Sequence, residues 1–290
     1  MLSLSAEMEA AIVAACREHQ VQHGRRRAGY VVVNQYFVQY GEPAVLAHSV
    51  KMRLFLASSE PRPDKPRIPQ LIHRFDNGQG TAYVVLEHVK LAKSPADLDK
   101  RIAAVVTWLS GLQIPPGHKL GPLGGGLIRH AFFDGQEAPL PFESVEALER
   151  YVEKGRTKLY KHGQGVDPIS LRDERLLCTQ ADLDKSHFGV DEAGRTVLMG
   201  LRSISFVPET FVRHTLVNAK LATLADCLGL SGESDMKAMA AIAHVLGMTA
   251  DPSLGLDNQG KTAKRDDGYC FRPCLELSVD LLFISSIGNT

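Results

Sequence analysis

The stretch Leu176–Phe211 reads LLCTQADLDKSHFGVDEAGRTVLMGLRSISFVPETF, and its pattern decides how the rest of the chain is interpreted. Two short apolar runs, Leu176–Cys178 and Thr196–Met199, flank a polar loop that carries Asp182 and His187. Short apolar runs separated by a polar segment are typical of strands joined by a loop. Functional side chains concentrate on such loops. Asp182 and His187 are therefore the first candidates for acid–base chemistry.

The second half of this stretch predicts a β-hairpin. The turn Asp191-Glu192-Ala193-Gly194 separates Phe188–Val190 from Thr196–Met199. Gly194 suits a turn position with a positive φ angle. We expect the polar loop to lead directly into this hairpin.

The composition is that of an ordinary globular protein of 290 residues. The chain has 33 Lys and Arg and 33 Asp and Glu, so charge does not argue for a nucleic-acid or anionic-membrane partner. Five scattered cysteines favour free thiols in a reducing compartment. The first residues carry Glu7 and Glu9 without a basic segment, and no apolar run reaches the roughly 18 residues that span a bilayer. We expect a cytoplasmic protein with a small-molecule ligand, and the oligomeric state stays open.

Residues 1–90 are interpreted as a sheet-rich lobe. The predicted elements are a helix over 5–22 capped by Ser5, a strand over 30–39, a helix over 45–57, and a hairpin formed by 68–75 and 81–89. Asp76-Asn77-Gly78 is a strong hairpin turn signal.

Residues 91–260 are interpreted as a mainly helical lobe that contains the loop and hairpin at 180–202. Ser94-Pro95 predicts a helix start, with Ser94 as N-cap. Residues 114–143 are rich in Pro and Gly and predict irregular structure. Further helices are expected from Ser144 and over 211–228 and 236–246. Residues 261–290 are a tail that we do not assign to a packed domain.

The chain resembles the fungal branch of the aminoglycoside-phosphotransferase-like family, from about residue 36 to 260. The matching pieces are FVQYG at 37–41, PRIPQLIHRF at 66–75, YVVLEHV at 83–89, GPLGGGLIRHAFF at 121–133, ADLDKSHF at 181–188, FVPETF at 206–211 and DPSLGLDNQG at 251–260. The resemblance implies an α+β fold with two protein-kinase-like lobes and a ligand cleft between them.

The chain departs from this family at the residues that hold ATP. The resemblance implies a phosphate-binding lysine on the strand where Gln39 stands, and a partner glutamate on the next helix at about Ser49. It also implies a histidine at the position of Gln180, two residues before the catalytic aspartate, which is present as Asp182.

The metal-binding positions differ as well. The asparagine that the family places five residues after the catalytic aspartate is His187 here. The family's magnesium-binding aspartate is Gly200 here, and Arg202 stands two residues later. Phosphoryl transfer depends on neutralising charge with a lysine and metal ions, and magnesium prefers carboxylate oxygens. We therefore expect neither a bound metal nor a cofactor.

Each candidate residue also has a structural interpretation. Asp182 is either an acid–base group or scaffold held by nearby backbone, and His187 is either its partner or a structural histidine. His130, in the insert at 121–133, faces the cleft or is buried. Gln39, Gln180, Gly200, Arg202 and His130 complete the candidate ligand-binding set.

Three hypotheses for function follow. The leading one is a pseudokinase-like protein that has lost ATP-dependent phosphotransfer and whose cleft binds or transforms a small apolar organic molecule. A cofactor-free isomerisation, cyclisation or dehydration in natural-product biosynthesis needs only positioned acid–base groups and a shaped pocket. The alternatives are a non-catalytic binding or scaffold protein and an atypical small-molecule phosphotransferase.

Overall fold

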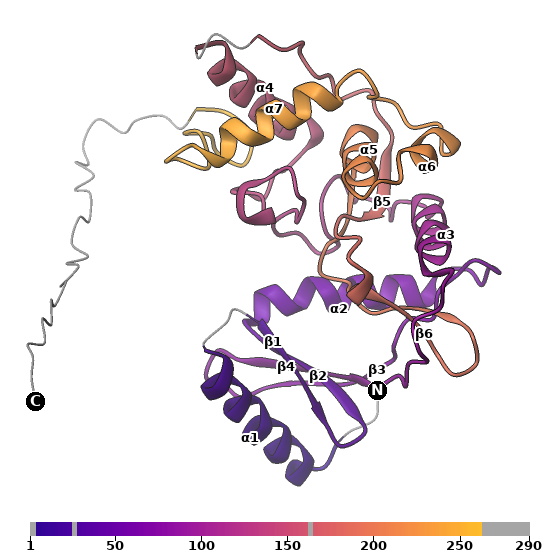
Figure 1. Cartoon of the computed structure of the whole chain (residues 1–290). Coiled ribbons are helices and arrows are strands. Elements are labelled where there is room, and N and C mark those ends of the chain that lie inside the picture. The colour runs from indigo at the N-terminus through magenta and orange to yellow at the C-terminus, as the bar shows by residue number, and fades with distance from the viewer. Residues whose placement is uncertain (1–3, 25–27, 162–164, 263–290) are drawn as a thin grey trace, which may run out of the picture.

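The computed structural model describes residues 4–24, 28–161 and 165–262, which form two lobes (Figure 1). The sheet lobe contains α1 (Ala6–His23), β1 (Ala28–Val33), β2 (Tyr36–Gly41), α2 (Pro43–Ser58), β3 (Leu71–Asp76) and β4 (Ala82–Glu87). The helical lobe contains α3 (Leu98–Ser110), η1 (Asp134–Gln136), α4 (Val145–Lys161), β5 (Leu176–Gln180), η2 (Lys185–His187), β6 (Phe188–Val190), β7 (Thr196–Leu198), β8 (Ile204–Pro208), α5 (Glu209–Asn218), α6 (Ala222–Cys227) and α7 (Met236–Gly247). The expected α+β fold with two lobes is confirmed.

The sheet of the first lobe is antiparallel, with strand order β1-β2-β4-β3. Side chains alternate between its two faces, as the pleat requires. Val38 and Tyr40 pack with α1 on one face, whereas Val84 and Leu86 pack with α2 on the other. Helix α2 therefore lies between the sheet and the helical lobe (Figure 1).

Two predictions for the sheet lobe fared differently. The helix with Ser5 as its cap is confirmed, since Ser5 Oγ accepts the Met8 N–H at 3.3 Å. The single strand expected over 30–39 is wrong, because the chain turns between β1 and β2. Asn34 adopts a φ of 54° there, a conformation that asparagine tolerates better than most residues. The surrounding β-branched and aromatic residues concealed this turn.

In the helical lobe, the predicted hairpin is confirmed as β6 paired with β7, with Gly194 at a φ of 81°. The helix expected to start at Ser94 begins at Leu98, with Asp97 in the cap position. The helix expected over 211–228 is two helices, α5 and α6, because Lys220 takes a φ of 62° between them.

The hairpin β6–β7 contacts two segments, one within the sheet lobe before β3 and the one that connects the lobes after β4. Before β3, the Arg67 N–H donates to Thr196 O at 2.7 Å and Arg67 O accepts the Leu198 N–H at 3.0 Å. After β4, the Ala92 N–H donates to Val190 O at 2.8 Å. The sheet lobe and the connecting segment are thereby bonded to one hairpin through the backbone.

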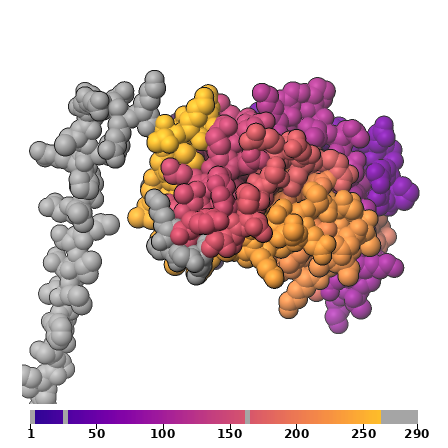
Figure 2. All heavy atoms as spheres, turned by 90° about the horizontal axis from the view of Figure 1, so that it is seen from above, coloured from indigo at the N-terminus to yellow at the C-terminus, as the bar shows by residue number. Residues whose placement is uncertain are grey.

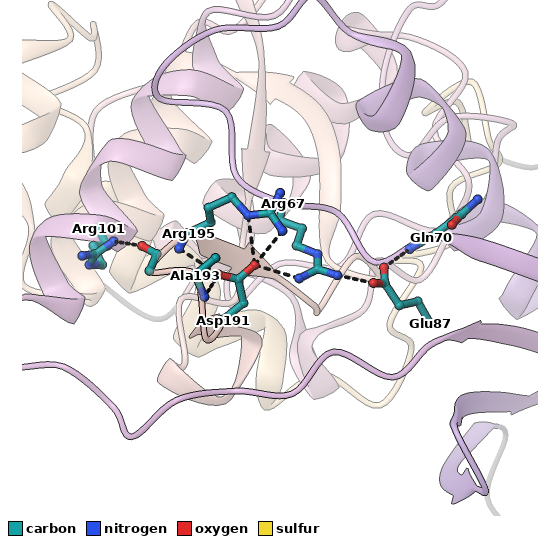
Figure 3. Close-up of polar contacts among 8 residues, drawn as sticks. Arg67, Gln70, Glu87, Arg101, Asp191, Ala193 and Arg195 are labelled. Carbon is teal, nitrogen blue, oxygen red and sulfur yellow. Dashed lines mark hydrogen bonds and ion pairs between the residues drawn. The ribbon is translucent and has the colours of Figure 1, made fainter.

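An ion network reinforces this junction (Figure 3). The Arg67 guanidinium donates to Asp191 at 2.7 Å and also pairs with Glu87 at the end of β4. Asp191 is buried and also accepts from Arg195 at 2.9 Å. Burial raises the pKa of Asp191, but the bonds from Arg67 and Arg195 outweigh it and hold that pKa at about 2. The network links the sheet lobe to the turn of the hairpin.

From above, the red residues around α4 and the orange and yellow residues of α5, α6 and α7 cover most of the visible face (Figure 2). No helix among the described residues is long and apolar enough to cross a membrane. The predicted tail lies outside the described residues, apart from Lys261 and Thr262.

Candidate functional site

A cavity of about 710 Å³ opens beside the loop that follows β5. Its wall is formed by the start of α3, the insert, this loop and the end of α5. The lining residues are Asp99, Ile102, Arg129, His130, Ala131, Gly135, Gln136, Ala181, Asp182, Leu183, Asp184, Lys185, Ser203, Thr215, Asn218, Ala219, Lys220 and Leu221. All of them belong to the helical lobe, so this cavity does not lie between the lobes as the sequence led us to expect.

The cavity lining is about half polar and carries six charged side chains, whereas the sequence led us to expect a cavity for an apolar ligand. Asp99, Asp182 and Asp184 give the lining three acidic groups, and Arg129, Lys185 and Lys220 give it three basic groups. Asp99 and Lys185 form an ion pair at 2.7 Å across its edge. A ligand with hydrogen-bonding or charged groups fits these walls better than a hydrocarbon does.

Asp182 is held at the cavity wall by its own loop. Its Oδ1 accepts the Asp184 N–H at 3.1 Å, and Asp184 Oδ1 in turn accepts the Ser186 N–H at 2.8 Å. The Asp182 side chain stays 40% exposed. Two successive side-chain-to-backbone hydrogen bonds therefore fix the loop while the Asp182 side chain stays partly exposed at the cavity wall.

His187 lies against Asp182 but does not line the cavity. Its Nδ1 donates to the Asp182 carbonyl oxygen at 3.0 Å and lies 3.6 Å from Asp182 Oδ2. The predicted Asp182–His187 pair is thus present as neighbours. The ring orients the loop from behind, so that only the aspartate reaches the lining.

Gly200 is packed against the His187 ring. A Cβ added at Gly200 would lie 2.5 Å from both Cγ and Cδ2 of His187. Atoms never approach that closely without displacement, so the ring occupies the space that a side chain at position 200 needs. A carboxylate at this position is incompatible with the present placement of His187.

Gln180 joins the same loop to this glycine. Its side-chain NH₂ group donates to the Gly200 carbonyl oxygen, and its Oε1 accepts the Asp182 N–H at 3.4 Å. The residue is fully buried. Gln180 connects the loop to the segment after β7 through these hydrogen bonds. It does not line the cavity.

Gln39 lies on strand β2 and is buried. It pairs with Val84 of β4, is 3% exposed, and its Oε1 has no hydrogen-bond partner. Ser49 on α2 is also buried, with its hydroxyl donating to Leu46 O at 2.9 Å. Neither side chain carries the charge that a lysine–glutamate pair would supply.

His130 reaches the cavity wall, yet both of its ring nitrogens are used by the fold. Nδ1 accepts the Phe132 N–H at 3.0 Å, and Nε2 bonds Phe211 O at 3.0 Å and Thr215 Oγ1 at 2.9 Å. Burial, and then the neighbouring His214, lower the pKa of His130 to about 3. His130 is a neutral anchor between the insert and α5.

Arg202 lies apart from the other candidates, at the wall of a second cavity between α2 and the insert. The structure therefore groups Asp182, His187, Gln180 and Gly200 around one loop, places Asp182 and His130 at the larger cavity, and separates Gln39 and Arg202 from it.

Several lining residues escaped the sequence interpretation. Thr215, Asn218 and Lys220 reach the cavity because α5 ends there and the chain reverses at Lys220. The run Asn218-Ala219-Lys220 was hidden inside the longer helix expected over 211–228. Predicting the end of a helix at Asn218 would have identified these residues.

No group of three or more His, Cys, Asp or Glu side chains among the described residues is arranged to hold a metal ion. Asp182 and Asp184 spend one carboxylate oxygen each on backbone amides, and position 200 offers no oxygen. This donor set does not fit the magnesium–nucleotide arrangement that the family resemblance implies.

The solved structures that resemble this fold include aminoglycoside phosphotransferases. The GDP complex of aminoglycoside 2'-phosphotransferase-IIIa has a TM-score of 0.47 and 12% identity, covering 81% of this chain and 87% of that one. The GDP and kanamycin complex of APH(2")-IIia has a TM-score of 0.48 and 12% identity, covering 84% and 88%. A ternary complex of APH(4)-Ia with AMP-PNP and hygromycin B has a TM-score of 0.44 and 12% identity, covering 80% and 89%.

At these scores and identities the likeness says nothing about site residues or activity. The chain matches no protein-family model, and no curated protein sequence matches it.

Proposed function

We propose that this protein has a phosphotransferase-like fold that no longer transfers phosphate from ATP, and that the cavity beside Asp182 binds and transforms a small organic molecule. The observation that carries the first half is the His187 ring packed against Gly200, where a Cβ would meet it at 2.5 Å. Metal-assisted phosphoryl transfer needs carboxylate oxygens at such a position and a cation beside the phosphates.

The second half rests on the arrangement of Asp182. Its carboxylate is positioned by the Asp184 N–H, is partly exposed, and faces a cavity large enough for a small organic ligand. A fixed carboxylate can accept a proton from a bound substrate and return it at another atom. Isomerisation, cyclisation and dehydration each need such a transfer and no redox partner. The charged lining favours a polar substrate.

The loss of nucleotide binding is tested by thermal unfolding. The melting temperature is measured with millimolar Mg-ATP, with magnesium alone, and with ATP plus EDTA. A ligand at 100 times its dissociation constant adds about 2.7 kcal/mol to the free energy of unfolding. We expect equal melting temperatures in all three samples. A rise of several degrees confined to Mg-ATP would sink the proposal.

The role of Asp182 is tested by identifying retained metabolites. Purified protein is equilibrated with a cell extract, and mass spectrometry identifies the small molecules that it retains and converts. Dehydration lowers the substrate mass by one water, whereas isomerisation and rearranging cyclisation leave it unchanged. Asp182→Asn keeps the shape and removes the titrating group, so we expect a loss of roughly 10²–10⁴-fold in rate. The exposed Asp173→Asn serves as control, and equal rates in both variants contradict an acid–base role.

A further inference from the structure

A second cavity of about 180 Å³ lies at the junction of the two lobes. Helix α2 forms one wall, the insert forms the other, and Arg202 closes the end. The lining residues are Ala44, Val45, His48, Ser49, Pro122, Gly126, Leu127, Arg129, Glu137 and Arg202. A liquid water occupies roughly 30 Å³, so the space holds a polyatomic group rather than a single water.

Arg202 brings an unmatched cation to this cavity. Its Nε is buried and has no hydrogen-bond partner, and its Nη1 donates to Tyr30 Oη at the long distance of 3.4 Å. No carboxylate of the described residues forms an ion pair with Arg202 within the usual 4.0 Å range. A buried donor of a charged group without an acceptor is costly, so the side chain is arranged for an acceptor that comes from outside the chain.

His48 brings a second unmatched atom from the opposite wall. Its Nδ1 is buried and has no hydrogen-bond partner. The backbone of the insert packs directly on this ring, because a Cβ at Gly126 would lie 2.4 Å from His48 Nε2. The ring donates to the Leu123 backbone of the insert, and burial lowers its pKa. Because Nδ1 has no partner, that donor is Nε2–H, and the neutral ring presents Nδ1 as a hydrogen-bond acceptor.

Arg129 supplies a second guanidinium, which lines both cavities. It pairs with Glu137 at 3.3 Å, so its charge is balanced within the wall. Two arginines and one glutamate leave the lining with a net positive charge. The planar fork of an arginine matches the oxygens of carboxylate and phosphate groups.

We propose that this cavity binds one oxyanion, the carboxylate or phosphate group of a small molecule, with Arg202 as its main donor. Arg129 adds positive charge from the insert. The unprotonated Nδ1 of His48 accepts a hydrogen bond from a hydroxyl of the same molecule, such as the P–OH of a protonated phosphate. Gln39, Asp182, His187 and Gly200 do not line the cavity. Ser49, the position at which the family resemblance implies the partner glutamate, does line it. The site therefore adjoins the positions at which the resemblance implies ATP binding without including the lysine and metal positions, and it does not depend on the reaction proposed for Asp182.

The test is isothermal titration calorimetry of the full chain with three probes: inorganic phosphate, phenyl phosphate and benzoate. Sodium chloride at matched ionic strength corrects for screening. We expect saturable binding of at least one probe in the millimolar range or tighter. Arg202→Gln should weaken it about tenfold or more, as expected for the loss of a charge-assisted hydrogen bond. Arg74 is an exposed residue on β3. Arg74→Gln removes the same charge there and should leave the affinity unchanged.

His48→Leu removes the acceptor on the opposite wall, and it still tests the site with inorganic phosphate if Arg202→Gln does not fold. A several-fold loss of affinity in this variant supports the site. Saturable binding of none of the three probes by the wild-type chain overturns the proposal. It is equally overturned if Arg202→Gln and Arg74→Gln weaken binding to the same extent, since that outcome indicates non-specific attraction to surface charge.

Discussion

Gly200→Asp restores the carboxylate that the family resemblance implies, and its cost is set by one contact. The new Cβ would lie 2.5 Å from His187 Cγ and Cδ2 and 2.9 Å from His187 Cβ. The backbone of Gly200 does not adopt a positive φ, so the penalty is steric and not conformational. Overpacking of this kind typically costs 1–3 kcal/mol, or about 2–4 °C of melting temperature per kcal/mol for domains of 150–250 residues. We expect Gly200→Asp to melt several degrees lower and to gain no ATP hydrolysis.

A double-mutant cycle isolates the cause. His187→Ala removes the ring, so Gly200→Asp should cost less in that background, with a coupling energy of about 1–2 kcal/mol. Gly165→Asp is the matched control, because its Cβ would meet Tyr160 at an ordinary 3.5 Å. Stability is measured by urea denaturation followed by circular dichroism. Equal costs of Gly200→Asp with and without the ring would refute the steric argument.

Three further variants test other contacts. Burial lowers the pKa of His130 to about 3 from 6.5, so the unfolded chain takes up a proton before the folded one does, and stability present above pH 6.5 is lost as pH falls toward 3. In His130→Gln, the urea concentration at the unfolding midpoint should change less with pH over that range. The same pH dependence as in the wild type contradicts the assignment. The pKa of Asp191 lies at about 2 instead of 3.8, so its contribution is present above pH 3.8 and lost as pH falls through 2; Asp191→Asn should abolish that acid limb in thermal melts, and an unchanged limb counts against it. Ser5→Ala removes the cap of α1 and should cost about 0.5–2 kcal/mol, checked by thermal unfolding against Ser234→Ala, and no difference between the two would remove the cap from the account.

Strong local signals were enough to predict much of the fold. The turn residues Asp76-Asn77-Gly78 and Gly194 located both hairpins, because few residues adopt their backbone conformations. Turns that contain neither glycine nor proline at the reversal were not predicted. Asn34 and Lys220 reverse the chain inside apolar runs, where tertiary packing overrides local preference.

Only the contacts between residues close in sequence were predictable for the site. Asp182 and His187 are neighbours in sequence, so their contact in space was expected and is present. The cavity walls come from α3, the insert and the end of α5, and no sequence pattern joins those segments. The contact between His187 and Gly200 depends on how the loop returns after β7, which only the packed structure determines.

The junction of the lobes has a consequence for how a ligand is selected. Because the hairpin β6–β7 bonds the segment before β3 and the segment after β4, and Asp191 is held by Arg67 of the sheet lobe, rotation of one lobe against the other would break several bonds together. The cavity between α2 and the insert is therefore preorganised. A ligand that fits loses little free energy to ordering the protein, whereas one that is slightly too large meets walls that do not yield. Such a pocket discriminates by shape at the moment of entry and not by closing around its ligand.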